Sequence, residues 1–205
     1  MAVPDDITIK WNKWIEDVNS VSEIGWKRCI VDIDNYGKTR DFELYTFTDA
    51  SKHAYAAVVY LKVYNETSNA VNLLFAKTRI APINEISIPR LELLGVLIGC
   101  RLSKFVAKQL DIPDIKQTIF TDSMCVIEWC KSDKPKKRFV QDKIKEIQLH
   151  DIKIGYVKSE ENPADIASRG ISVQNLLLNH LWWEGPWWLK SIKNIQEGTK
   201  FRYCS

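Results

Sequence analysis

The sequence predicts an α/β fold with a mixed sheet flanked by helices. Three strand-like runs come first, and later strand-like runs alternate with segments whose apolar residues follow helical spacing. The composition, with 45% hydrophobic and 27% charged residues, is typical of a globular protein. A length of 205 residues fits one domain with some additional material.

The first segment, residues 1–37, is a lead-in to this pattern. A turn-rich stretch, DIDNYGKTR, follows a predicted helix whose apolar residues are Ile9, Trp11, Trp14, Ile15 and Val18. We expect the main α/β domain over residues 38–172 and a tryptophan-rich extension that packs on it over residues 173–205.

Three strands are predicted next. FELYTFTDAS alternates from Phe42 onward, and AYAAVVYLKVY and VNLLFAKTRIA are rich in β-branched and aromatic residues. The polar stretch NETSN separates the last two runs, which predicts an antiparallel hairpin.

A long helix follows in ISIPRLELLGVLIGCRLSKF, with Pro89 near its first turn. Glu92 lies inside its apolar run, between Leu91 and Leu93. A carboxylate in apolar surroundings is costly unless a cation holds it, so this residue needs a partner.

The remaining elements alternate. QTIFTDS predicts a strand, MCVIEWC a helix, FVQDKIKEIQL a second helix after the basic loop KSDKPKKR, and IKIGYV a fifth strand. In NPADIASRG, Asn162 is the predicted N-cap, Pro163 the first helical residue and Gly170 the stop. Three strands in a meander are thus followed by two that alternate with helices.

Acidic residues mark the ends of these elements. Asp49 and Asp122 end strands, and Asp165 lies in the first turn of the last helix. Parallel neighbouring strands would project the two aspartates at one carboxyl edge, where α/β proteins place ligands. Together with Glu92, these acids would repel one another unless a cation neutralised them, and oxygen ligands alone suit magnesium or manganese. Each aspartate taken singly is also explained as a helix N-cap.

Other features narrow the possible functions. Five cysteines without a C-x-x-C pair indicate reduced thiols, and three scattered histidines disfavour a zinc site. The absence of a long apolar run predicts no membrane partner, and we expect an intracellular, cytoplasmic protein. The net charge of +3 permits an anionic partner. The four tryptophans in LWWEGPWWL are interpreted as a hydrophobic clasp rather than a base-stacking platform.

Four motifs together resemble the Asp-Glu-Asp-Asp tetrad of type 1 ribonuclease H: FTDAS, IPRLELL, FTDS and NPADIASRG. The sequence around these motifs, from about Trp11 to Leu189, is similar to the ribonuclease H region of BEL/Pao-type LTR retrotransposon polyproteins. The lead-in resembles the segment that connects reverse transcriptase to ribonuclease H. The resemblance implies a ribonuclease H-like fold, with three antiparallel strands and then two parallel ones.

The resemblance also implies the chemistry. It places metal ligands at Asp49, Glu92, Asp122 and Asp165, and it implies hydrolysis of the RNA strand of an RNA–DNA hybrid with two Mg²⁺ ions, with Mn²⁺ as a substitute. Its implied partners are the hybrid and the reverse transcriptase region of the same polyprotein, with a virus-like particle or the nucleus as further locations. Many relatives carry a histidine in the loop before the last acid, whereas this loop, VKSEENPAD, has none. Glu160 or Glu161 would then carry the proton, or be merely solvated.

Binding of the hybrid requires cations for its phosphates. The candidates are, in the basic loop, Lys136, Lys137 and Arg138; beside Glu92, Arg90; and on the third strand, Lys77 and Arg79. A solvated run of charge is the alternative for the loop. At the level of the whole chain, the alternatives to a hybrid ribonuclease are a catalytically weak or inactive nucleic-acid-binding module of a transposon-derived protein, and a two-metal nuclease acting on DNA.

Overall fold

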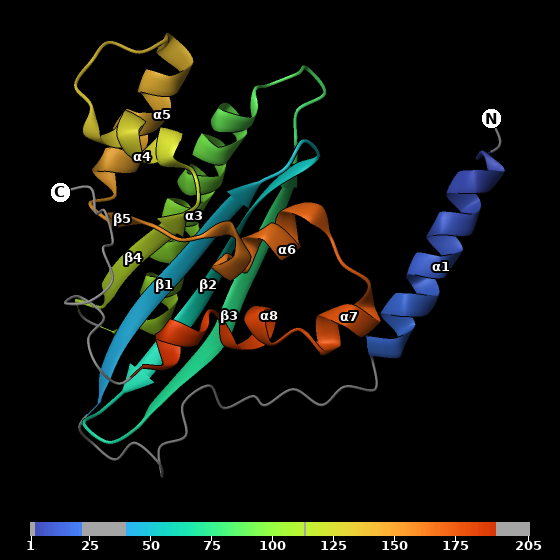
Figure 1. The fold of residues 1–205 in the computed structure, drawn as a ribbon, viewed down its shortest axis with the longest axis horizontal. Helices are drawn as coiled ribbons and strands as arrows, with labels where there is room; N and C mark the ends of the chain where they lie inside the picture. Colours follow the sequence, from blue (N-terminus) through green and yellow to red (C-terminus); the bar gives the residue numbers. More distant parts are fainter. Residues whose placement is uncertain (1–2, 22–39, 113, 192–205) are drawn as a thin grey trace.

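A computed structural model describes residues 3–21, 40–112 and 114–191 of the chain. Its centre is a five-stranded sheet with the strand order β3-β2-β1-β4-β5 (Figure 1). The strands are β1 (Asp41–Ala50), β2 (Ala54–Tyr64), β3 (Asn69–Ile80), β4 (Lys116–Thr121) and β5 (Lys153–Tyr156). The turn-rich stretch predicted after the first helix lies outside the described residues, except for Arg40.

The pairing of the strands confirms the predicted mixed sheet. β1 pairs with β2 and β2 with β3 in antiparallel fashion, while β1 pairs with β4 and β4 with β5 in parallel. The parallel pairs require crossovers, which the helices between β3 and β5 supply. Because β1 and β4 are parallel, their carboxyl ends lie at the same edge of the sheet.

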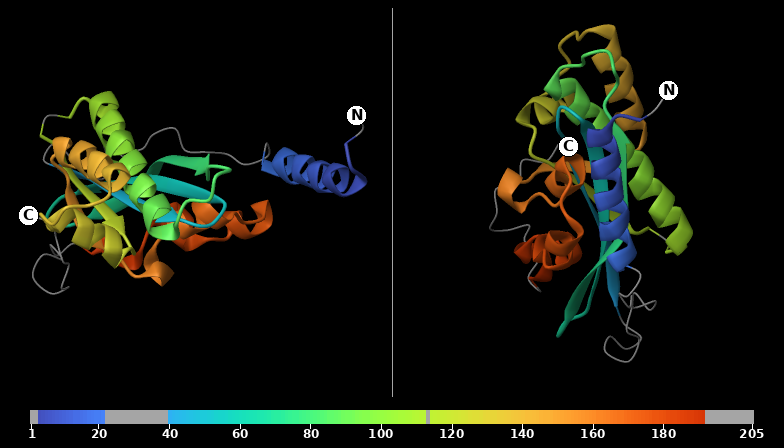
Figure 2. Two further views of the ribbon diagram at one scale, coloured as in Figure 1. Left: turned by 90° about the horizontal axis from the view of Figure 1, so that it is seen from above. Right: turned by 90° about the vertical axis from the view of Figure 1, so that its right-hand side faces the viewer.

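Helices cover the two faces of the sheet separately (Figure 2). One face is covered by α3 (Ile88–Leu110), α4 (Met124–Lys131) and α5 (Arg138–Leu149). The other face carries α6 (Ala164–Arg169), α8 (His180–Glu184) and the 3₁₀ helix η2 (Trp187–Lys190), with α7 (Val173–Leu177) between α6 and α8. A short 3₁₀ helix, η1 (Ser159–Glu161), precedes α6.

The helix α1 (Asp5–Val21) stands apart from the sheet and lies beside α7 (Figure 1). The Gln174 side chain donates a hydrogen bond to Asp17 at 3.3 Å across this contact. The rings of Trp11 and Trp14 contact each other at a tilt of 30°, with 5.1 Å between ring centroids, yet both are more than half exposed. No helix among the described residues is long and apolar enough to cross a membrane.

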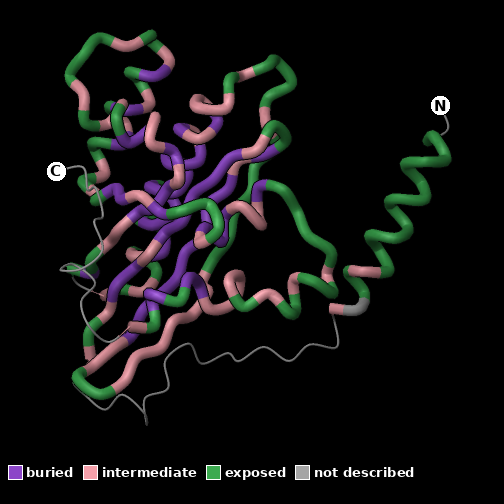
Figure 3. Tube along the Cα trace, viewed as in Figure 1, coloured by how far each residue is buried: buried purple, intermediate pink, exposed green. Residues whose placement is uncertain are grey.

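The buried residues follow the sheet and the helix faces turned toward it (Figure 3). On the α3 face the core joins Leu93, Leu97 and Ile119 to residues of α5. On the α6 face it is largely aromatic, with Phe47, Phe120 and Trp188 in mutual contact.

Two glycines set the distance between α3 and the end of β1. A Cβ added at Gly99 would lie 2.6 Å from Thr48 Cγ2, and one at Gly95 would lie 3.1 Å from the carbonyl oxygen of Asp49. Because neither position has room for a side chain, α3 lies directly against the strand that carries Asp49. This close approach brings the N-terminal part of α3, with Glu92, to the carboxyl edge of the sheet.

One predicted boundary is wrong by a residue. The N-cap of α6 is Pro163, with φ of −64°, rather than Asn162. The Asn162 side chain still accepts a hydrogen bond from the Ala164 N–H, at 3.2 Å, but its amide nitrogen donates to the Thr48 carbonyl at 3.0 Å. Asn162 thus ties the start of α6 to β1. Gly170 ends the helix as predicted, with φ of 82°.

Candidate carboxylate site

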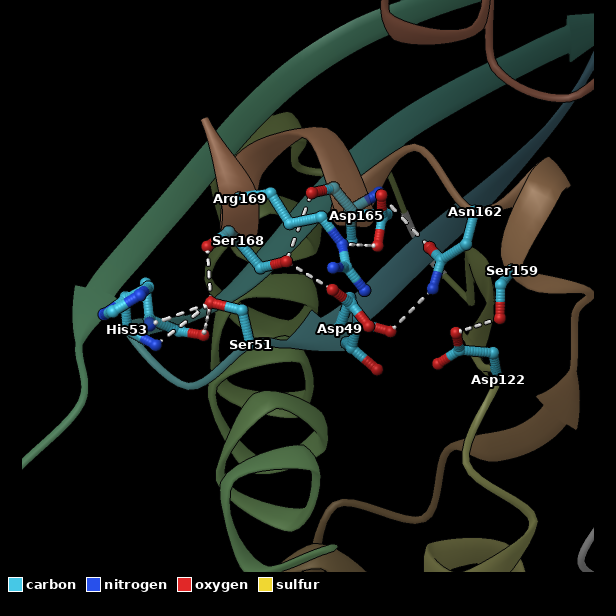
Figure 4. Close-up of polar contacts among 12 residues, drawn as sticks. Asp49, Ser51, His53, Asp122, Ser159, Asn162, Asp165, Ser168 and Arg169 are labelled. Carbon is cyan, nitrogen blue, oxygen red and sulfur yellow. Dashed lines mark hydrogen bonds and ion pairs between the residues drawn. The ribbon is translucent and has the colours of Figure 1, made fainter. Parts of the chain in front are cut away.

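Four acidic side chains from distant segments gather at the carboxyl edge of β1 and β4, and we call them the carboxylate site: Asp49, Glu92, Asp122 and Asp165. Thr48 and Thr121 are register partners in the parallel pair, so the aspartates that follow them leave the sheet at the same level. Asp165 lies in the first turn of α6, and Glu92 is the fifth residue of α3. Figure 4 shows the three aspartates facing a common space.

Burial and the charges of neighbouring carboxylates shift Asp49 and Glu92 toward protonation. Asp49 is only 4% exposed, and desolvation raises its pKa, with further increases from the charges of Asp122 and Asp165. Desolvation likewise raises the pKa of Glu92, and the charges of Asp122 and Asp49 add to it. These electrostatic contacts show that the fold places the four carboxyl groups close enough to interact as charges.

Each acid accepts a hydrogen bond from one side chain. Ser168 Oγ donates to Asp49 Oδ2, Ser123 Oγ to Glu92 Oε2 at 2.5 Å and Ser159 Oγ to Asp122 Oδ2 at 2.6 Å. Asp165 is different, because its Oδ1 accepts from the guanidinium of Arg169. Three neutral hydroxyl groups and one cation therefore donate to the four acids, and Figure 4 shows those of Ser159, Ser168 and Arg169.

The donor set fits a divalent cation. Asp122 Oδ1 is buried without a hydrogen-bond partner in the structure, which leaves one carboxylate oxygen uncompensated. Hard oxygen ligands of this kind are those that Mg²⁺ and Mn²⁺ prefer. Among residues 3–21, 40–112 and 114–191, no three acidic, histidine or cysteine side chains are already arranged as a metal site.

Further hydrogen bonds fix α6 against the sheet. Ser51 Oγ donates to the Ser168 carbonyl at 2.8 Å, and Thr78 Oγ1 donates to the Ala167 carbonyl at 3.1 Å. With the bond from Asn162 to β1, the six-residue helix is attached to the end of β1, to the turn that follows it and to β3. Asp165 is consequently held by a helix too short to be stable alone.

The basic loop and Arg90 lie near each other. The guanidinium of Arg90 stands 5.6 Å from the ring centroid of Phe139, the second residue of α5. Lys136 Nζ donates to the carbonyls of Ser132 and Lys134, so its charge stabilises the loop itself. Lys137 and Arg138 are exposed, and the side chain of Arg138 is 96% accessible beside Asp142.

Lys77 and Arg79 lie on the opposite face from Asp49. Asp49, Ala56 and Thr78 are register partners across three strands, and Thr78 contacts α6. Because neighbouring residues of a strand alternate between faces, Lys77 and Arg79 point toward α3. There they line a hollow of about 270 Å³ together with Phe75, Ile98, Arg101, Leu102 and Phe105. The structure does not bring these two residues to the carboxylate site.

The loop before Asp165 and the tryptophan-rich segment meet. Glu160 is exposed, whereas Glu161 accepts a hydrogen bond from Trp187 Nε1 at 3.0 Å. Trp187 is 74% exposed, while Trp188 is 6% exposed and packs in the aromatic core. The two neighbouring tryptophans thus have different surroundings.

Sequence reasoning did not identify the partners of the acids. The spacing of Asp165 and Arg169, four residues apart in a helix, is a signal that could have found their ion pair. Ser123 directly follows Asp122, and Ser168 lies one turn after Asp165, but only the folded structure shows that these hydroxyl groups reach Glu92 and Asp49. Ser159 carried no recognisable signal.

A meander of three antiparallel strands, two further parallel strands and acids at their carboxyl edge define a ribonuclease H-like protein. The family model of the Pao retrotransposon-like RNaseH-like domain matches residues 1–123. The chain belongs to this family. The matched region contains Asp49, Glu92 and Asp122 and ends before Asp165.

Solved structures of low sequence identity are similar to part of this chain. RNase H1 from the halophilic archaeon Halobacterium salinarum is 10% identical, with 60% of this chain and 90% of that chain covered and a TM-score of 0.39. The N-terminal RNase H domain of Rv2228c from Mycobacterium tuberculosis is 15% identical, covering 60% and 92% at a TM-score of 0.41. LC11-RNase H1, solved in complex with an RNA/DNA hybrid, is 16% identical, covering 67% and 99% at a TM-score of 0.43. A search of curated proteins finds no match to this chain.

Proposed function

We propose that this domain is an endoribonuclease that hydrolyses the RNA strand of RNA–DNA hybrids during retrotransposon reverse transcription. The observation that carries the proposal is the convergence of four carboxyl groups, from β1, α3, the end of β4 and α6, at one edge of the sheet. A structural role does not account for this arrangement, because burial and the neighbouring carboxylates raise the pKa of Asp49 and of Glu92, and Asp122 Oδ1 is left uncompensated.

Asp49, Glu92, Asp122 and Asp165 would hold the divalent cations, two Mg²⁺ ions by the family resemblance. Such ions, when bound, supply an activated water and charge stabilisation for the leaving 3′ oxygen. The surrounding residues orient the ligands: Ser168 and Asn162 fix the end of β1, and Ser123 holds Glu92. Glu160 is the exposed acid of the loop that would exchange a proton with solvent, since Glu161 is held by Trp187.

Contact with the hybrid is proposed for the surface formed by Arg90 and the basic loop. Arg90 precedes Glu92 by two residues, and its contact with Phe139 links it to Lys137 and Arg138 at the start of α5. Cations on this surface would pair with phosphates, while contacts to 2′-hydroxyl groups would distinguish RNA from DNA.

The direct test is an assay of the purified chain with a labelled RNA–DNA hybrid, with Mg²⁺ or with EDTA. We expect cleavage of the RNA strand alone and only with the metal. Matched single-stranded RNA, duplex RNA and duplex DNA serve as the comparison substrates.

The other outcomes distinguish the alternatives. Tight binding of the hybrid without cleavage, at any Mg²⁺ or Mn²⁺ concentration, would identify a nucleic-acid-binding module. Equal cleavage of duplex DNA would identify a nuclease of different specificity.

The reverse transcriptase region of the same polyprotein is the proposed partner of α1. The exposed rings of Trp11 and Trp14 give this helix an apolar side that the sheet domain does not cover. If this side is the contact, replacing both tryptophans by alanine will abolish binding of the purified polymerase region without changing hybrid cleavage by the separate chain. Unchanged binding would contradict the assignment.

A further inference from the structure

Arg169 gives one acid of the carboxylate site, Asp165, a charged partner. Of the four acids, only Asp165 has an ion-pair partner among the described residues, and the partner is Arg169, four residues further along α6. The other three acids accept from serine hydroxyl groups. A hydroxyl group can rotate away without a change in charge, whereas a guanidinium cannot leave or share a carboxylate without an electrostatic cost.

The guanidinium of Arg169 also interacts electrostatically with other acids of the site. The hydrogen bond and the charge of Asp165 raise the pKa of Arg169, and Asp49 and Asp122 add to this effect. One fixed positive charge therefore offsets part of the repulsion within the carboxylate site in the absence of a metal ion. The same charge repels any divalent cation that approaches Asp165.

We propose that Arg169 is a positioning residue that holds Asp165 in the metal-free protein and competes with the divalent cation for that carboxylate. This inference rests on the proposed function, because it requires that the carboxylate site binds a metal. Metal-free protein gains stability from the pair, and the metal-bound protein does not need it. By thermodynamic linkage, the residue that stabilises only the metal-free state weakens metal binding.

The test is a titration of the full chain with Mn²⁺ alone, followed by calorimetry and by the electron paramagnetic resonance signal of free Mn²⁺. Arg169→Gln keeps a long polar side chain but removes the charge. We expect the Mn²⁺ affinity of this variant to increase roughly tenfold, the size of one screened charge contact. Arg169→Lys, which keeps the charge, should stay near the parental affinity.

Thermal unfolding supplies a second readout. In EDTA, Arg169→Gln should unfold at a lower temperature than the parent, and at saturating Mn²⁺ the difference should disappear. A merely structural role would give the same deficit under both conditions, and that result would overturn the inference.

Arg101 provides the matched control. It forms an ion pair with Glu146, its side chain is 53% exposed against 65% for Arg169, and both carboxylate partners are 33% exposed. This pair joins α3 to α5, so Arg101→Gln should leave Mn²⁺ affinity unchanged. If the parental chain binds no Mn²⁺, the proposed function fails and the inference with it. If the parent binds Mn²⁺ and Arg169→Gln binds it equally, only the inference fails.

Discussion

Among individual residues, Asp122 shows most clearly that the carboxylate site is unfavourable for the stability of the metal-free protein. One of its oxygens accepts from Ser159, while the other is buried without a hydrogen bond in the structure. An unpaired buried oxygen is tolerated in proteins chiefly where function requires it.

The substitution Asp122→Asn tests this residue. It keeps the shape and removes one charge, so hybrid cleavage should fall by orders of magnitude. In EDTA, stability should rise by up to about 1 kcal/mol as repulsion is relieved. Cleavage rates and urea unfolding check the two effects. Asp151→Asn is the control, since Asp151 lies before β5 at the far edge of the sheet with φ of 49°, a conformation that asparagine accepts. Near-parental cleavage by Asp122→Asn would contradict the metal assignment.

The raised pKa of Asp49 predicts a pH dependence of stability. Between the unfolded pKa of an aspartate, about 4, and its higher folded pKa, the folded protein binds more protons than the unfolded chain. The free energy of unfolding in EDTA should therefore fall as pH rises through this window. In Asp49→Asn that part of the decline should vanish. Urea unfolding at a series of pH values from 4 to 8 measures it, and parallel pH curves for the two proteins would refute the prediction.

Sequence motifs identified the acids but not their partners. Asp49 and Asp122 follow strand-like runs, and strand ends are readable from local patterns. The bond from Ser168 to Asp49, in contrast, joins residues 119 positions apart and depends on how α6 lies against the sheet. Such contacts follow from packing of elements, about which local sequence carries little information.

At the level of elements, the basic loop before α5 gives a salt-dependent prediction. Lys136 binds loop carbonyls, whereas its neighbours Lys137 and Arg138 are exposed, with Arg138 in an ion pair with Asp142 at 3.9 Å. Changing both to alanine should weaken hybrid binding and reduce the slope of log affinity against log salt by roughly 2 units. Turnover at saturating hybrid should stay near parental.

Binding titrations at several salt concentrations provide the measurement. The double replacement of Lys104 and Lys108 by alanine is the control, because both are exposed toward the C-terminal end of α3, away from the carboxylate site. Equal slopes for the basic-loop variant and the parent would leave the loop as a solvated run of charge.

The tryptophan-rich segment offers a pair of neighbouring positions with opposite environments. Trp188 lies 5.2 Å from Phe120 and 5.9 Å from Phe47 between ring centroids, whereas Trp187 is mostly exposed. Trp188→Ala should cost about 3–5 kcal/mol of unfolding free energy, and Trp187→Ala much less. Denaturant unfolding compares them. Similar losses for both variants would mean that the segment is not part of the core.

For the whole molecule, the order and pairing of the strands could be predicted because three runs joined by short turns form a meander and later strands need helical crossovers. The face of the sheet on which each basic side chain would lie could not be predicted. Lys77 and Arg79 are level with Asp49 along the sheet, but strand alternation and the register with β2 turn them toward α3. A shift of one residue would have placed them beside α6.

The position of Trp188 in the chain has a consequence for biosynthesis. Ribosomes deliver the polypeptide from its N-terminus, and domains fold as their segments emerge. All four acids and every strand of the described residues precede Trp188, yet the aromatic rings of Phe47 and Phe120 have no cover from it until that residue has left the exit tunnel. A nascent chain therefore exposes this apolar surface until Trp188 has emerged. Fragments that stop at Gly170 should bind a hydrophobic dye and be degraded by dilute protease far faster than the full chain, and equal protease resistance would disprove this dependence on the last aromatic contact.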